Sequence, residues 1–364
     1  MGEQKTLIIA GGGTGGHVLA GVAIAEAWKT TLGPASSRVL FIGSRGGLEE
    51  KLVPRAGFSL ELLMIGPLNN VRLMRKLRTL AELPCAFCKS LWILLRERPQ
   101  AVVGVGGYSS GPLVLLARQI GWLWGARVTI LEQNAFPGFT NRILGYFAHQ
   151  VFSAFPGLEA CFTRGKVQVT GNPIRQNFRP LPSAKREPFT ILIFGGSQGA
   201  LGINSLVLDA LPLLDDLKDR LRFIHQTGEK DFARVKEGHQ KARTNSRVEK
   251  FIYEMGEAYA EASLLICRAG SSTLAEVAAV GRASILIPFP QATNQHQLKN
   301  AEIYQASGAA LILNQSQARG EDLARLIRQF LGDPSQLQAM EKAVGKFYRP
   351  TAAQEIVHAL TQTR

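Results

Sequence analysis

The stretch Leu7-Ile-Ile-Ala-Gly-Gly-Gly-Thr-Gly-Gly-His17 places an apolar run directly before a glycine-rich turn, and a helix-like segment follows. Glycine lets the backbone approach a ligand closely, and the N–H groups at a helix start attract anions. A second copy, Ile191-Leu-Ile-Phe-Gly-Gly-Ser-Gln-Gly-Ala200, lies just past the middle of the chain. Two such copies predict two nucleotide-binding domains that face each other across a cleft.

Short apolar runs alternate with helical patterns along the whole chain. Near-continuous apolar strands separated by helices are typical of parallel sheets covered on both faces. The expected strands are 6–10, 38–42, 101–105, 127–132, 150–153 and 166–170 in the first half, and 189–194, 222–226, 248–251, 263–267, 284–287 and 310–313 in the second. The expected fold class is therefore α/β, with two Rossmann-like, doubly wound parallel-sheet domains.

The 364 residues are enough for two domains with full cores, and 46% hydrophobic content is typical of an ordered protein. A stretch rich in glycine, proline and polar residues, 171–188, marks the expected boundary. We expect an N-terminal domain over 1–174, a C-terminal domain over 175–348, and a helix over 349–364 that packs back on the first domain.

The net charge of +14 is concentrated in the first half, where residues 1–174 hold 18 Lys and Arg against 9 Glu and no Asp. A basic surface indicates an anionic partner: phosphate groups, nucleic acid or an anionic membrane. No sequence-reading module for nucleic acid is present, so we expect no nucleic-acid partner. Four cysteines without a second pair or suitably spaced histidines predict no zinc site.

Residues 71–98 interleave apolar and aromatic side chains with seven cations. This pattern fits an amphipathic patch on a membrane surface. It fits equally well a core helix with a solvated basic face, and the pattern alone favours neither. The patch residues singled out are Arg72, Arg75, Lys76, Arg78, Leu91 and Trp92.

A dinucleotide-binding fold needs an acid near the end of its second strand to hold the ribose diol. Here that strand ends Gly43-Ser-Arg45, and its counterpart in the second half ends Ile224-His-Gln226. Neither offers a carboxylate, which argues against a nicotinamide-dependent oxidoreductase. Neither turn continues into the Gly-Lys-Ser/Thr of a Walker phosphate loop, and we expect no cofactor.

A third turn, Cys267-Arg-Ala-Gly-Ser-Ser-Thr-Leu-Ala-Glu276, follows another apolar strand and opens a helix. Its N–H groups suit a pyrophosphate, and Glu276 suits a ribose diol. Thr273 and Glu276 also have the spacing of a capping box, and the two roles are compatible.

His17 lies at the start of the first predicted helix, where the positive helix end disfavours a protonated imidazole. A neutral imidazole there suits a general base, and the alternative is that His17 only caps or orients the turn. Carboxylates are sparse and no Asp-x-Asp occurs, so we expect no metal. A diphosphate would then be stabilised by helix N-termini and Arg175.

With these residues assembled, the chain closely resembles the MurG family of bacterial cell-wall glycosyltransferases over nearly its whole length. The motifs that carry the resemblance are Gly12-Gly-Thr-Gly-Gly-His17, Gly106-Gly-Tyr108, Glu132-Gln-Asn134, Gly171-Asn-Pro-Ile-Arg175, Gly195-Gly-Ser-Gln-Gly-Ala200, Cys267-Arg-Ala-Gly270 and Gln295-His-Gln297. The resemblance implies the GT-B fold, with an acceptor- and membrane-facing first domain and a second domain that binds the UDP-sugar. One local departure is Asn294-Gln295, where acids are expected in many relatives.

The resemblance further implies inverting, metal-independent transfer of N-acetylglucosamine from UDP-N-acetylglucosamine to the 4-hydroxyl of N-acetylmuramic acid in undecaprenyl-linked lipid I, giving lipid II and UDP. It places the enzyme peripherally on the cytoplasmic face of the bacterial inner membrane, at an anionic surface, with His17 as the base. The implied donor contacts are Thr14, Gly15, Gly16, Asn134, Arg175, Ser197, Ile252, Ser271, Ser272, Thr273, Leu274, Ala275, Glu276 and Gln297. The alternative is another UDP-sugar glycosyltransferase or an epimerase of the same fold with a different acceptor.

Overall fold

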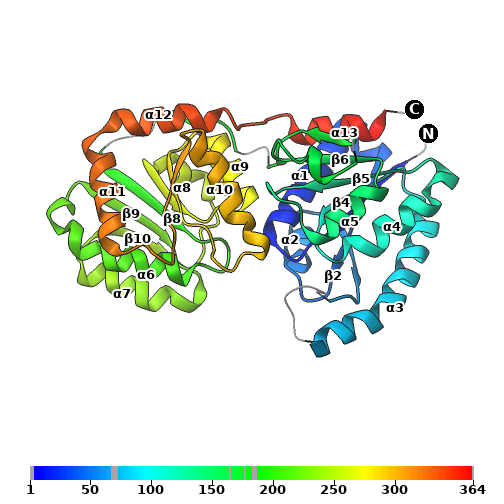
Figure 1. The fold of residues 1–364 in the computed structure, drawn as a ribbon, viewed down its shortest axis with the longest axis horizontal. Helices are drawn as coiled ribbons and strands as arrows, with labels where there is room; N and C mark the ends of the chain where they lie inside the picture. The colour runs from blue at the N-terminus through cyan, green and yellow to red at the C-terminus, as the bar shows by residue number, and fades with distance from the viewer. Residues whose placement is uncertain (1–3, 67–72, 164, 176–177, 183–186, 363–364) are drawn as a thin grey trace. The chain divides into compact units, whose positions relative to one another are not determined.

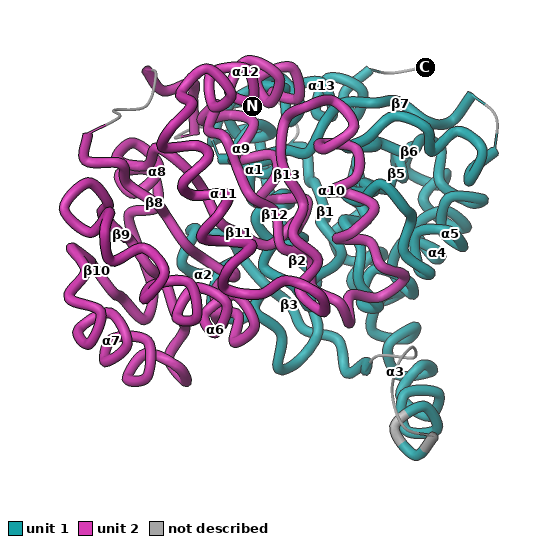
Figure 2. Tube along the Cα trace, turned by 60° about the vertical axis from the view of Figure 1, so that its left-hand side comes forward, with its two compact units in different colours: residues 1–176, 349–364 teal, residues 177–348 magenta. Residues whose placement is uncertain are grey.

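A computed structural model describes residues 4–66, 73–163, 165–175, 178–182 and 187–362. The chain forms two compact units, residues 1–176 with 349–364, and residues 177–348 (Figure 2). Arg175, expected at the start of the second domain, belongs to the first unit.

Unit 1 contains a parallel sheet of seven strands in the order β3-β2-β1-β4-β5-β6-β7. The strands are β1 (Lys5–Gly11), β2 (Ser37–Ser44), β3 (Ser59–Leu63), β4 (Ala101–Gly106), β5 (Arg127–Glu132), β6 (Gln150–Ser153) and β7 (Val167–Val169). Strand β3 was not among the expected strands. It lies at the sheet edge with mostly half-buried side chains, so it lacks the continuous apolar run of the central strands.

Helices cover both faces of this sheet (Figure 1). They are α1 (Gly15–Leu32), α2 (Glu49–Arg55), α3 (Leu73–Glu97), α4 (Ser110–Ile120), α5 (Phe139–Phe147) and α13 (Ala352–Thr361). Successive residues of β1 point to opposite faces of the sheet and pack in two separate hydrophobic clusters. Leu7 packs in the cluster that contains Trp28 of α1, and Ile8 packs in the cluster that contains Ile93 of α3. Ile356 of α13 joins the Trp28 cluster, so the C-terminal helix packs on α1.

Unit 2 contains a parallel sheet of six strands in the order β10-β9-β8-β11-β12-β13. The strands are β8 (Phe189–Phe194), β9 (Leu221–Gln226), β10 (Asn245–Glu249), β11 (Leu264–Cys267), β12 (Ser284–Leu286) and β13 (Ala310–Ile312). The helices are α6 (Leu201–Ala210), α7 (Phe232–Lys241), α8 (Met255–Glu261), α9 (Ser271–Val280), α10 (His296–Ala306), α11 (Gly320–Gly332) and α12 (Pro334–Gly345).

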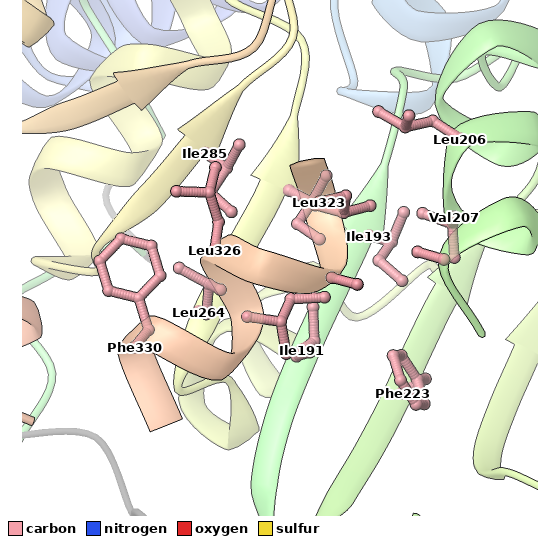
Figure 3. Close-up of a cluster of buried hydrophobic side chains, with 14 of the residues drawn as sticks. Ile191, Ile193, Leu206, Val207, Phe223, Leu264, Ile285, Leu323, Leu326 and Phe330 are labelled. Atoms are coloured by element: carbon pink, nitrogen blue, oxygen red, sulfur yellow. The ribbon is translucent and has the colours of Figure 1, made fainter. Parts of the chain in front are cut away.

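The core of unit 2 lies between this sheet and the helices α6 and α11 (Figure 3). Ile191 and Ile193 of β8 belong to the same buried cluster as Val207 of α6 and Leu323 of α11. Full burial of such side chains stabilises a fold by about 1.5–3 kcal/mol each. Because the strands are buried on both faces, their carboxyl ends are held firmly, and the functional turns begin there.

Within the segment 71–98, residues Leu73–Glu97 form one helix, α3, which continues through Pro84. Arg72 falls outside the described residues, and for Arg75 only the backbone position in α3 is described. Among the helices of the described ranges, none combines the length and apolarity that a bilayer crossing requires.

Candidate functional site

The first glycine turn joins β1 to α1 in unit 1. Thr14 is the N-cap of α1, and its hydroxyl oxygen accepts from the backbone N–H of His17 at 3.5 Å. His17 Nδ1 lies 3.1 Å from the carbonyl oxygen of Gly12. Because a carbonyl oxygen only accepts, the neutral ring carries its proton on Nδ1, and Nε2 is the basic nitrogen.

Two glycines at the end of β4 make this arrangement possible. Gly106 and Gly107 have φ angles of +103° and +85°. A methyl group on Gly106 would lie 2.9 Å from His17 Nε2, and one on Gly107 would lie 2.6 Å from the carbonyl oxygen of Gly12. The Gly106-Gly107 turn therefore admits the imidazole ring against the backbone, which no larger residue allows.

A buried carboxylate that the sequence analysis missed lies beneath the first turn. Glu49, the first residue of α2, is 1% exposed. Its Oε2 accepts from the N–H of Gly13 at 2.9 Å, and its Oε1 accepts from the N–H and the hydroxyl of Ser44 at 2.8 and 2.9 Å. The sequence feature that could have indicated this carboxylate is the set of glycines that surround it, Gly12, Gly43 and Gly47.

A second buried carboxylate, Glu132, ends β5. It accepts hydrogen bonds from the backbone of Asn134 and Gly138 at 2.9 and 3.0 Å, and from Asn141 Nδ2 at 2.9 Å. Burial raises the pKa of Glu132, and these hydrogen bonds partly offset that shift. The loop that carries the predicted contact Asn134 is thus fastened from inside the unit.

Arg175, predicted to face a diphosphate, lies in unit 1 within electrostatic range of α1. Burial raises the pKa of Glu26 on α1, and the positive charge of Arg175 partly offsets that shift. Arg175 thus lies close enough to Glu26 to interact with its charge, and it belongs to the same unit as His17.

The second glycine turn joins β8 to α6 in unit 2 and is fastened by an amide. Gln226, at the end of β9 and 1% exposed, donates through Nε2 to the carbonyl oxygen of Gly196 at 2.9 Å. Its Oε1 accepts from the N–H of Ile252 at 2.8 Å. One side chain therefore joins the turn that contains Ser197 to the backbone of Ile252, and sequence reasoning had assigned it no role.

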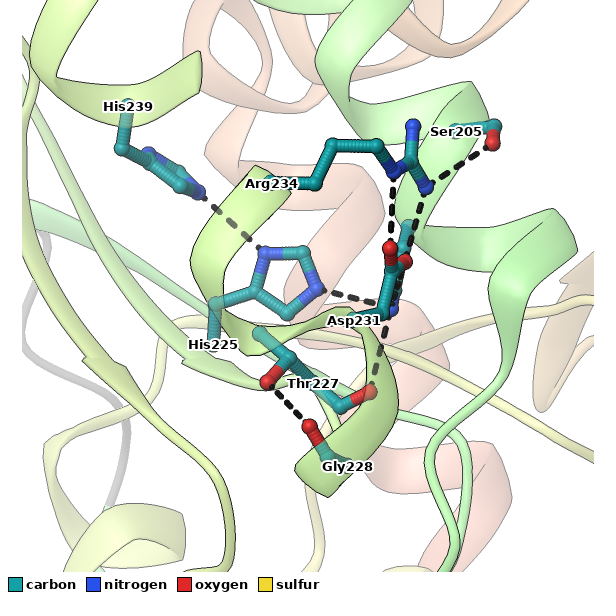
Figure 4. A network of polar contacts seen from close by, with 8 residues as sticks. Ser205, His225, Thr227, Gly228, Asp231, Arg234 and His239 are labelled. Atoms are coloured by element: carbon teal, nitrogen blue, oxygen red, sulfur yellow. Dashed lines mark hydrogen bonds and ion pairs between the residues drawn. The ribbon is translucent and has the colours of Figure 1, made fainter. Parts of the chain in front are cut away.

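A buried polar network holds α6 against the end of β9 (Figure 4). His225 Nε2 donates to Asn204 Oδ1 at 3.1 Å, and Asn204 Nδ2 donates to the carbonyl oxygen of Thr227 at 3.1 Å. His225 Nδ1 lies 3.2 Å from His239 Nε2. Burial lowers the pKa of His225 to about 3 and that of His239 to about 4. Both rings are therefore neutral at pH 7.

The third turn leads from β11 into α9 and carries the predicted residues 271–276. The N-cap of α9 is Gly270, so Thr273 lies within the helix and does not form a capping box with Glu276. The carboxylate of Glu276 instead accepts from the hydroxyl of Tyr259 at 3.1 Å. Tyr259 is fully buried, so it orients Glu276 from inside the unit.

Gln297 is the last of the predicted donor contacts along the chain, and it lies in the first turn of α10. Its Oε1 accepts from the N–H of Phe289 at 2.9 Å, which orients its amide nitrogen as the group available to a ligand. Nearby, the buried guanidinium of Arg268 donates to the carbonyl oxygen of Ile287 at 2.9 Å. Burial lowers the pKa of Arg268 to about 10.

Helix α3 buries one face and exposes the other. Ala86, Ile93 and Leu94 pack in the core of unit 1. The exposed large apolar side chains are Met74, Leu77, Leu80, Leu91, Trp92 and Leu95. Lys76 and Arg78 are also exposed, and Arg78 pairs with Glu82 at 2.9 Å. The exposed face of α3 thus carries apolar as well as basic side chains.

Further exposed apolar side chains lie on unit 1 outside α3, and sequence reasoning missed them. Trp122 and Leu123 lie on the short helix η2 (Gly121–Trp124) and are 72% and 60% exposed. Helix α5 adds Phe139, Ile143, Tyr146 and Phe147. Helix α4 packs against both α3 and α5, so these residues belong to neighbouring elements.

Comparison with known proteins agrees with this architecture. The model of the glycosyltransferase family 28 N-terminal domain matches residues 7–153, and that of the family 28 C-terminal domain matches residues 190–356. A protein of Myxococcus xanthus (strain DK1622), named UDP-N-acetylglucosamine--N-acetylmuramyl-(pentapeptide) pyrophosphoryl-undecaprenol N-acetylglucosamine transferase, is 45% identical over 353 residues, 96% of this chain and 91% of that protein. A protein of the same name from Syntrophus aciditrophicus (strain SB) is 43% identical, covering 96% of each chain.

The crystal structure of Acinetobacter baumannii MurG is similar at 32% identity with a TM-score of 0.76, over 99% of this chain and 100% of that one. Two parallel-sheet units with glycine turns at the strand ends define a GT-B glycosyltransferase. The chain belongs to glycosyltransferase family 28 and, within it, to the MurG family.

Proposed function

We propose that this chain transfers N-acetylglucosamine from UDP-N-acetylglucosamine to the 4-hydroxyl of N-acetylmuramic acid in lipid I, giving lipid II and UDP. The observation that carries the proposal is the match at 45% identity over 96% of the chain to a protein named for this transfer. A match of that extent covers both units, so it includes the acceptor side as well as the donor side.

The reaction is a single displacement with inversion at C1. The acceptor oxygen attacks C1 of the sugar while the bond from C1 to the UDP oxygen breaks, and its electrons leave on the diphosphate. His17 Nε2 takes the hydroxyl proton, and the hydrogen bond from Nδ1 to Gly12 supports that tautomer. Only one base is needed, because no enzyme-bound intermediate forms.

The donor is held mainly by unit 2. Ile252 lies at the uracil edge, Glu276 accepts from the ribose hydroxyls, and Gln297 binds the sugar hydroxyls. Ser197 and the residues 271–275 contact UDP-N-acetylglucosamine, with the N–H groups around Gly270 to Thr273 at the diphosphate. Thr14, Gly15, Gly16, Asn134 and Arg175 are the proposed donor contacts in unit 1. Helix N-termini and Arg175 stabilise the leaving diphosphate without a metal. Within the described ranges no three His, Cys, Asp or Glu side chains gather as a metal site would need.

The first test is radiolabel transfer from UDP-N-acetylglucosamine to a short-chain lipid I analogue in EDTA. Transfer is the expected result, with a β-1,4 linkage in the product. Loss of activity in EDTA that Mg²⁺ restores would contradict metal independence. Binding of the donor without transfer would instead favour another acceptor on the same fold.

We also place the enzyme on the cytoplasmic face of the inner membrane through α3. Its exposed apolar residues would enter the lipid interface, and Lys76 and Arg78 would meet anionic headgroups. The pair K76E and L77E should abolish flotation with vesicles containing anionic lipid. The matched pair K236E and K241E on α7, a basic helix of unit 2, should not.

A further inference from the structure

Glu49 lies in an enclosure built for a carboxylate. A methyl group on Gly12, Gly43 or Gly47 would lie between 2.2 and 2.4 Å from atoms of the Glu49 side chain. Three neighbouring glycines thus make room for this side chain, and three hydrogen bonds from Gly13 and Ser44 fix both of its oxygens. The enclosure specifies both the position and the orientation of the carboxylate.

This carboxylate takes the place that an anionic ligand would have in a glycine turn. The N–H of Gly13 donates to Glu49 Oε2 at 2.9 Å. That donor cannot serve a phosphate at the same time, and a second anion beside Glu49 would be repelled. The first turn therefore resembles a phosphate loop in sequence, although its Gly13 N–H is committed to the protein.

The same peptide group reaches His17 at its other end. The N–H of Gly13 and the carbonyl of Gly12 belong to one planar peptide unit. Glu49 accepts from the N–H end, and His17 Nδ1 lies 3.1 Å from the carbonyl oxygen. Donation to a carboxylate polarises the peptide and strengthens its carbonyl as an acceptor. The carboxylate thus acts on the imidazole through one interposed peptide.

We propose that Glu49 is a positioning residue for His17, acting through the Gly12–Gly13 peptide, and that Gly13 holds no substrate phosphate. This inference rests on the proposed function, in which His17 is the base. It assigns to the first turn a relay from a carboxylate through a peptide to an imidazole, where a serine protease has a direct contact between carboxylate and imidazole.

The test compares E49Q with E50Q in the transfer assay. The amide of E49Q must turn an NH₂ group toward one of the N–H donors, so the peptide shifts and kcat should fall about tenfold to hundredfold. Both KM values should stay within about twofold of wild type. Glu50, the next residue of the same helix, is the matched control, because its carboxylate accepts from the N–H of Gly46 but is exposed. Equal kcat values for the two variants would overturn the inference, as would a lower acceptor KM with kcat retained.

A second measurement separates this inference from the proposed function. Nitrogen-15 spectra of labelled histidine should show the Nδ1–H tautomer of His17 in the wild type and a mixture in E49Q. If the wild type transfers no sugar yet shows this change, the proposed reaction fails and the positioning contact stands. If neither spectrum nor kcat changes, the contact fails. Should E49Q not fold, S44A removes one donor to the carboxylate and should lower kcat in the same direction by less.

Discussion

The two glycine turns look alike in sequence and differ in what fastens them. The first turn is closed by the carboxylate of Glu49, which accepts from the N–H of Gly13. The second is held by the amide of Gln226, which donates to the carbonyl oxygen of Gly196. In the first turn a protein side chain therefore occupies an N–H group, and in the second turn a protein side chain occupies a carbonyl group.

This difference assigns the turns different tasks. A turn that gives a donor to a protein carboxylate suits a base and a neutral hydroxyl. In the second turn the Gln226 amide takes a carbonyl group, so this contact uses none of the N–H donors that suit an anionic ligand. A glycine-rich sequence therefore predicts a strand, a turn and a helix. The hydrogen-bond partners of the turn's N–H and carbonyl groups decide which ligand the turn suits.

The largest expected effect tests the task of the first turn. H17A should lower kcat by about 10²- to 10⁴-fold, since it removes the general base. Binding of UDP, measured by calorimetry, should stay unchanged because the proposed UDP contacts belong mainly to unit 2. S197A in the second turn is the converse variant and should raise the donor KM more than it lowers kcat. Weaker UDP binding by H17A would reverse the assignment.

A smaller effect tests how tightly the second turn is built. Gly199 has a φ of +74°, and a methyl group there would lie 2.0 Å from the carbonyl oxygen of Thr227. G199A should therefore destabilise unit 2 by about 2–4 kcal/mol in urea unfolding. Gly196 has a φ of +91° and open space around a methyl group, so G196A should cost only about 1–2 kcal/mol. Equal losses would show that contact with Thr227 does not constrain the turn.

Glu276 in unit 2 is the carboxylate that we propose binds the ribose hydroxyls of the donor. Glu276 accepts from the hydroxyl of Tyr259, whereas Glu49 accepts from two backbone N–H groups and a hydroxyl. E276Q should raise the KM for the donor about tenfold, since it loses a charge-assisted hydrogen bond. Y259F should raise it by less. Both effects should vanish with a donor that lacks the ribose hydroxyls, and persistence of either effect would place Glu276 elsewhere.

The smallest expected effect is a difference between the two units in how the free energy of unfolding changes with each pH unit. His225 and His239 have pKa values lowered to about 3 and 4, so the unfolded chain binds protons that the folded chain does not. Stability of unit 2 should fall as pH drops from about 6.5 toward 4, by about 1.4 kcal/mol per pH unit for each histidine. In unit 1 the raised pKa of Glu132 acts oppositely, so its contribution is complete at low pH and declines as pH rises.

Urea titrations from pH 7 to pH 5 check this difference. H239Q should roughly halve the slope for unit 2, and H358Q, at an exposed position on α13, should leave it unchanged. A slope in H239Q as steep as in wild type would contradict the assignment to the buried pair.

Most of the fold could be predicted because parallel strands are apolar along their whole length. The strands 127–132, 150–153 and 189–194 were predicted with the bounds that the structure has. Edge strand β3 was missed, since its half-buried residues lack that signal. The predicted capping box between Thr273 and Glu276 is wrong, because the N-cap of α9 is Gly270. Local residue spacing does not specify the residue at which a helix begins. The donor contacts and His17 stay predictions from the family motifs.

The sequence by itself determined two α/β units, their glycine turns, the family and the amphipathic helix α3, because these depend on local periodicity and on motifs of adjacent residues. Only the tertiary structure decided that Glu49 closes the first turn, that Gln226 and the His225 network fasten the second, and that Tyr259 orients Glu276. These contacts join residues far apart in the chain or around a bend. Which of them meet depends on how the strands are ordered in each sheet, and no local pattern encodes that order.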